Sequence, residues 1–233
     1  MALARQGHLH RASQTLMHST ILSHDVDVLQ QLRDLHPQQD SNIPRRPFND
    51  DVIVVRPDAD FIKLVKSMVT GSAPGPTGWS ADLLYALTPN DDCLRGIAAL
   101  ITDMINGSLT DLDADALLSS TLLAIPKEGS DMHRPIAISE LFYRLARKKV
   151  MSMVSPIANE LFAPIQYGVG MRDGTENIIH SLRHLLTSPS LLSGLSIDFA
   201  NAFNSRDRGD ILRSVHNNPN LSFSWNLGIW ETI

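Results

Sequence analysis

Apolar residues recur every three or four positions along much of this chain, the spacing of helices that bury one face. Seven segments before residue 190 predict helices. They are a short one holding Leu29, Leu32 and Leu35; one capped by Asp58 and stopped at Gly71; Ala81 to Leu87, capped by Ser80; Leu94 to Ile105, closed by Asn106-Gly107; Asp111 to Leu118; one starting at Ser139 and interrupted at Ser155-Pro156; and one opened by Thr175, with Ile178, Ile179, Leu182, Leu185 and Leu186 on one side.

Three shorter apolar runs have the length of strands instead. Thr121 to Pro126 and Pro135 to Ser139 are joined by the polar stretch KEGSDMHR, which predicts a β-hairpin. Leu195 to Phe199 predicts a third strand, followed by a helix with Ile211, Leu212 and Val215 that Asn204 or Ser205 would cap. We therefore expect an α+β protein that is mainly helical.

Composition narrows the class of protein. Among 233 residues, 43% are hydrophobic and 19% charged, as in globular domains, and no apolar run approaches the roughly 20 residues of a membrane span. The N-terminus lacks a signal-peptide pattern, and the single Cys93 excludes an internal disulfide. We expect an intracellular protein, nuclear or cytoplasmic, that is not secreted and has no membrane partner.

Several ligand sites can be set aside. Gly168, Gly170 and Gly174 miss the GxGxxG spacing of a dinucleotide site by one residue, and no glycine-rich loop ends in the GK[ST] of a phosphate-binding P-loop. His180 and His184 lie four residues apart, a spacing that can bind metal, but no third ligand is near. We interpret them as surface or half-buried histidines.

Charge is distributed unevenly. The formal net charge is -5, yet five basic residues and one acid, Glu140, lie between His133 and Val150. A cluster of this kind can bind nucleic-acid phosphates, but it can equally be the solvated face of a helix. Both interpretations stay open.

Five segments, taken together, carry a resemblance to a known family. In order they are SAPGPTGWSADLL, LLAIPK, RPIAISELFYRLARKKV, QYGVGMRDGTENII and LSIDFANAF. They resemble the N-terminal part of the reverse transcriptase domain of non-long-terminal-repeat retrotransposons, in the family's order.

The resemblance implies an incomplete right-hand polymerase. Residues 1–47 would be a helical N-terminal extension and linker, 48–193 a fingers-like region with the hairpin, and 194–233 the first strand and helix of the palm. The activity implied is RNA-directed DNA polymerisation, in which deoxynucleotides are added to a DNA primer on an RNA template with two Mg²⁺ ions.

The resemblance also assigns site residues. Lys127 and Arg134 match the pair that grips the triphosphate of the incoming dNTP; two cations at a hairpin tip suit phosphate, although they could also be solvated surface charges. Asp198 matches the first catalytic aspartate, a ligand of both magnesium ions, and the Phe199 carbonyl would be a further ligand. Phe203 matches the gate that rejects a 2′-hydroxyl; its alternative is core packing.

One departure from the family matters for activity. The second metal-binding element, a pair of adjacent aspartates, is absent: the acids after Asp198 are Asp207, Asp210 and Glu231. We therefore expect a polymerase fragment that is inactive alone, with an exposed palm strand whose open edges would favour aggregation or pairing. The alternatives are a non-catalytic nucleic-acid-binding remnant of a retroelement and a helical interaction module without a nucleic-acid role.

Overall fold

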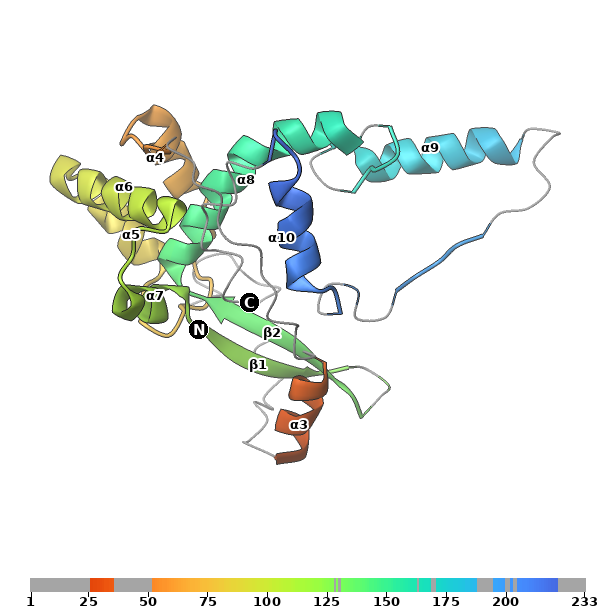
Figure 1. The fold of residues 1–233 in the computed structure, drawn as a ribbon, viewed down its shortest axis with the longest axis horizontal. Helices are drawn as coiled ribbons and strands as arrows, with labels where there is room; N and C mark the ends of the chain where they lie inside the picture. The colour runs from red at the N-terminus through yellow and green to blue at the C-terminus, as the bar shows by residue number, and fades with distance from the viewer. Residues whose placement is uncertain are drawn as a thin grey trace.

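The computed structural model describes residues 26–35, 52–127, 129, 131–162, 164–168, 171–187, 195–199, 202 and 205–221. Within these residues the protein has eight helices and one two-stranded antiparallel hairpin, which confirms the α+β class (Figure 1). The elements are α3 (Val26–Asp34), α4 (Ala59–Lys66), α5 (Ala81–Leu87), α6 (Asp91–Asn106), α7 (Asp111–Leu118), β1 (Ser120–Pro126), β2 (His133–Ser139), α8 (Leu141–Phe162), α9 (Gly174–Leu186) and α10 (Arg208–His216).

The hydrophobic core lies between α4, α5 and α6 and the first half of α8 (Figure 1). The apolar faces predicted for these helices are the ones that pack there. Side chains with less than 2% exposure include Val65, Leu84, Ile101, Ile105, Leu141 and Leu145. Burial of these side chains, at about 1.5–3 kcal/mol each, is the main favourable contribution to the fold.

Three predicted helix boundaries are confirmed. Asp58 caps α4 by accepting a hydrogen bond from the Phe61 amide at 2.9 Å. Ser80 caps α5 in the same way, and Gly107 ends α6 in the left-handed conformation with φ 62°. These boundaries depend on local chemistry alone, because Asp58 and Ser80 each satisfy an amide that the helix leaves unpaired and glycine adopts the left-handed conformation readily.

The helix α4 ends at Lys66, earlier than the predicted stop at Gly71. Side chains from other elements take the carbonyl groups at its end: the Tyr85 hydroxyl donates to the Lys66 oxygen at 2.8 Å, and Lys148 Nζ donates to the Ser67 oxygen at 2.6 Å. With these oxygens already paired, the chain leaves the helix without losing hydrogen bonds.

The predicted break at Ser155-Pro156 is wrong, because α8 runs without interruption from Leu141 to Phe162 with Pro156 inside it. Proline removes one backbone hydrogen bond and bends a helix rather than always ending it. Figure 1 shows that α8 bends along its course. Among the described helices none, α8 included, combines the length and the apolar character that a membrane span requires.

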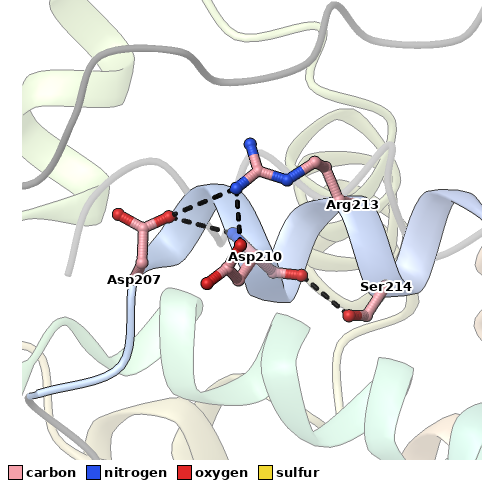
Figure 2. A network of polar contacts seen from close by, with 4 residues as sticks. All are labelled: Asp207, Asp210, Arg213 and Ser214. Atoms are coloured by element: carbon pink, nitrogen blue, oxygen red, sulfur yellow. Dashed lines mark hydrogen bonds and ion pairs between the residues drawn. The ribbon is translucent and has the colours of Figure 1, made fainter.

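The predicted caps of the last helix, Asn204 and Ser205, are also wrong. Asp207 caps α10 by accepting from the Asp210 amide at 3.0 Å (Figure 2). Arg213 Nη2 lies 2.5 Å from Asp210 Oδ1 and 3.8 Å from Asp207 Oδ1. Asp207 is the better cap because its charge also interacts favourably with the positive end of the helix dipole.

Leu195 to Phe199 does not form the predicted strand. The segment is neither helix nor strand, and Leu195, Ile197 and Phe199 are 86%, 67% and 74% exposed. In the part of the chain that the structure describes, the hairpin has only two strands and does not pair with this segment. A strand needs a neighbour for its backbone hydrogen bonds, and without one an apolar run remains irregular.

The hairpin extends away from the helical core (Figure 1). Its register joins Ser120 to Ser139 at the base, next to α8, and Pro126 to His133 near the tip. Leu122, Leu123, Ile125 and Ile136 on its strands are 36–44% exposed. Helix α3 packs beside β2, where Gln31 Oε1 lies 2.9 Å from His133 Nδ1. The hairpin is thus contacted by α3 along β2 and joined to α8 at its base.

Candidate functional site

Lys127 and Arg134 lie at the far end of the hairpin. Lys127 directly follows β1, and Arg134 is the second residue of β2. Both side chains are exposed, and neither forms a hydrogen bond or ion pair with another described residue. The structure thus presents two cations that no described protein group neutralises.

The register places these two cations on the same face of the hairpin. Arg134 pairs with Ile125, and the ladder continues to Lys127, whose amide donates to the Met132 carbonyl at 2.9 Å. Residues two apart on a strand point to the same side, so Lys127 shares a face with Ile125 and hence with Arg134. Diagonal neighbours of this kind are about 7–8 Å apart, within reach of one polyphosphate.

The base of the hairpin contains a hydrogen-bonded contact between a loop and the end of β2. Glu140 lies between β2 and α8 and is 0% exposed. Its Oε1 accepts from the Thr77 amide at 2.5 Å, and its Oε2 accepts from the Thr77 hydroxyl at 2.6 Å. The glycine-rich loop, residues 71–79, is thereby held against the first turn of α8.

Gly75 is required for this approach. A Cβ at Gly75 would lie 2.7 Å from the Glu140 Cα and 2.8 Å from its Oε1. Gly78 closes the turn, its amide donating to the Gly75 carbonyl at 3.0 Å with φ +83° at Gly78. Two glycines of the loop therefore have distinct roles, one in close packing and one in backbone conformation.

Some residues of the basic run form hydrogen bonds within the protein. Arg144 donates to the Ala73 carbonyl at 3.2 Å and to the Ser72 hydroxyl at 3.4 Å, and Lys148 binds the Ser67 carbonyl. Burial lowers the pKa of Arg144, while the Glu140 carboxylate acts in the opposite direction. Arg147 is exposed and lies over the Tyr143 ring, 5.5 Å from its centroid. Two of the four cations on α8 thus hold the glycine-rich loop and the end of α4.

Asp198 is exposed and accepts a hydrogen bond at Oδ1 from the Phe199 amide at 3.0 Å. No group of three His, Cys, Asp or Glu side chains that could hold a metal occurs among the described residues. Mg²⁺ needs converging oxygen ligands, and the Asp198 carboxylate with the Phe199 carbonyl supplies too few for a two-ion site. The metal-ligand roles of Asp198 and Phe199 therefore stay predictions.

The remaining predicted residues are placed as follows. Phe203, the predicted sugar gate, lies outside the described residues. His180 and His184 are both exposed on α9, as predicted for surface histidines. The structure does not join Asp198 to the hairpin, and Figure 1 shows the segment 195–199 as an extended stretch apart from the hairpin. The two halves of the predicted site are therefore separate in the described protein.

Sequence reasoning missed the roles of Thr77, Glu140 and Arg144. One signal was present: Glu140 is the single acid in the basic run and directly follows a strand. An isolated carboxylate at the end of a strand can be either solvent-exposed or buried. Only the packing of the loop onto α8 shows that Glu140 is buried.

Comparison with known proteins gives one relationship. No protein-family model matches the chain, and no solved structure matches it. The chain is 31% identical over 176 residues to the retrotransposable element SLACS 132 kDa protein of Trypanosoma brucei gambiense. The match covers 75% of this chain and 14% of the longer relative. The chain is thus distantly related to a protein of a retrotransposable element.

Proposed function

We propose that this chain is part of an RNA-directed DNA polymerase of a retrotransposon and that its hairpin binds the triphosphate of the incoming deoxynucleotide. In this proposal Lys127 and Arg134 are the phosphate ligands. The RNA template and DNA primer are the partners of the complete enzyme.

The observation that carries the proposal is that Lys127 and Arg134 lie on the same face of an exposed hairpin. Lysine contributes a compact point charge, while the arginine guanidinium can donate two parallel hydrogen bonds to phosphate oxygens. Both side chains are exposed, so binding requires no ion pair with a described residue to be broken first. The relationship to a retrotransposable-element protein supports a role in copying nucleic acid.

The transfer step itself needs more than the described residues provide. Magnesium would supply a Lewis acid at the phosphates and lower the pKa of the attacking hydroxyl. Asp198 is the predicted protein ligand, but a single exposed carboxylate holds Mg²⁺ weakly. We therefore propose nucleotide binding for this chain by itself and no nucleotide transfer.

The test is equilibrium binding of a fluorescent deoxynucleoside triphosphate, followed by anisotropy in magnesium buffer. Lys127→Ala and Arg134→Ala should each weaken binding about tenfold or more, because a hydrogen bond to a charged group contributes about 1.5–3 kcal/mol. Lys63→Ala and Arg95→Ala are the matched controls, since they remove exposed cations, 78% and 62% accessible, from other helices.

The control variants have the same net charge as the hairpin variants and should bind the triphosphate nearly as well as the unmodified chain. Equal losses in all four variants would show that only general electrostatic attraction is present. That outcome, or no binding at all, would contradict the proposal.

A further inference from the structure

We propose that Thr77 and Glu140 are positioning residues: their contact fixes the direction of the hairpin and so places Lys127 and Arg134. The functional part of this inference rests on the proposed role of these two cations. The structural part concerns the hairpin alone and can be tested separately.

The first observation is the completeness of the contact. Both carboxylate oxygens of Glu140 accept hydrogen bonds from the same residue, one from the Thr77 amide and one from its hydroxyl. A bidentate contact fixes orientation as well as distance, because rotation about either bond would break the other. Glu140 is fully buried, so water does not compete for these oxygens.

The second observation is the place of Glu140 in the chain. It directly follows Ser139, the last residue of β2, and directly precedes Leu141, the first residue of α8. Ser139 is 9% exposed and Leu141 0% exposed, so the junction is buried on both sides. Because Glu140 is the single residue between strand and helix, an anchor on Glu140 acts on the angle at which the hairpin leaves α8.

A third observation shows why this angle matters. Each strand has seven residues, so the hairpin is roughly 20 Å long at about 3.3 Å per residue. A rotation of about 5° at the base would therefore move the tip by roughly 2 Å. A displacement of about 1 Å is already enough to disturb a bound reactant.

Other contacts support the loop or the hairpin without replacing this one. Arg144, one turn after Glu140, holds the loop at Ala73 and Ser72. Helix α3 packs mainly against β2, so it stiffens the hairpin rather than fixing its angle to the core. Among the described residues, the contact with Thr77 is the one that holds the side chain of Glu140 at the base.

The direct test measures the hairpin direction by double electron–electron resonance. Spin labels are placed through Asp131→Cys near the tip and Lys66→Cys at the end of α4, both exposed positions, in a Cys93→Ser chain. Thr77→Val removes the hydroxyl and keeps the side-chain shape, while Thr77→Ser keeps the hydroxyl. Glu140→Gln is a second variant, which leaves one acceptor oxygen.

We expect Thr77→Val and Glu140→Gln to shift or broaden the interspin distance by about 2 Å or more, as the hairpin length implies. Thr77→Ser should retain the original distribution. Thr88→Val is the control for general destabilisation, because its hydroxyl bonds the Tyr85 carbonyl at 2.8 Å, on the helix α5 and not at the hairpin base. It should leave the distribution unchanged.

The outcomes separate the two proposals. An unchanged distribution in Thr77→Val and Glu140→Gln, or equal broadening in Thr77→Ser and Thr88→Val, would overturn the positioning role. If the distribution broadens and Arg134→Ala still binds the fluorescent triphosphate normally, the hairpin is positioned as inferred and the proposed function is wrong. If the positioning role and the proposed function are both correct, Thr77→Val should weaken triphosphate binding several-fold and Thr77→Ser should not.

Discussion

Substitution of Gly75 by alanine should destabilise the protein strongly, although it adds a single methyl group. The new Cβ would lie 2.7 Å from the Glu140 Cα, which is backbone and cannot move aside. Either the glycine-rich loop lifts from α8 or the hydrogen bonds to Glu140 lengthen. Overpacking of a buried site costs about 1–3 kcal/mol, and a weakened hydrogen bond to a buried charge adds to this.

We therefore expect Gly75→Ala to lower the free energy of unfolding by about 3 kcal/mol, which corresponds to a melting temperature roughly 6–12 °C lower for a chain of this size. Urea denaturation followed by circular dichroism measures the change. A urea midpoint for Gly75→Ala that equals or exceeds the midpoint of the unmodified protein would refute the close packing of the loop on Glu140.

Two other glycines provide matched controls. Gly96 lies on the exposed side of α6, and a Cβ added there would have no atom within 4 Å, so Gly96→Ala should stabilise the helix by about 0.5–1 kcal/mol. Gly78 also has open space but a φ of +83°, so Gly78→Ala should cost about 1–2 kcal/mol through backbone strain. The free energy of unfolding should therefore be highest for Gly96→Ala, lower for Gly78→Ala and lowest for Gly75→Ala. This order distinguishes the effects of helix propensity, backbone conformation and steric contact.

Three further predictions concern other parts of the chain. Asn106→Ala should destabilise the protein by about 2 kcal/mol in the same urea assay, because the Asn106 amide pairs with both the amide and the carbonyl of Ile53, at 3.0 and 2.8 Å. Burial raises the pKa of Tyr85, so the folded state holds this proton more tightly and stability should fall as pH rises above about 10; the difference between Tyr85→Phe and the unmodified protein should shrink over that range, and a constant difference would contradict it. The purified chain should give no template-dependent product in a primer-extension assay, and product that disappears in Asp198→Ala would show the opposite.

The sequence alone determined the elements whose signals are local. Asp58 and Ser80 could be identified as helix caps because a short oxygen-bearing side chain satisfies an amide three residues away. The hairpin followed from two apolar runs of strand length separated by a polar stretch. Its register, and with it the shared face of Lys127 and Arg134, follows from strand alternation once the pairing is known.

Signals that depend on distant parts of the chain failed or were missed. Leu195 to Phe199 has the composition of a strand, but pairing requires a neighbour that no local pattern supplies. Two local signals failed as well: α8 continues past Pro156, and Asp207 caps α10 in place of Asn204 or Ser205. Phe203 and its predicted gate stay untested, as do the metal-ligand roles of Asp198 and Phe199.

The sequence by itself determined the presence of the helices, the caps Asp58 and Ser80, the hairpin and the two cations at its end, because each depends on residues within a few positions of one another. The tertiary structure alone decided that Glu140 is buried, that Thr77 is its partner from 63 residues earlier, and that Arg144 and Lys148 bind protein carbonyls. The residues next to a charged side chain in the sequence do not indicate which distant group it will contact. Its role is settled by which backbone and hydroxyl groups the fold brings within hydrogen-bonding distance.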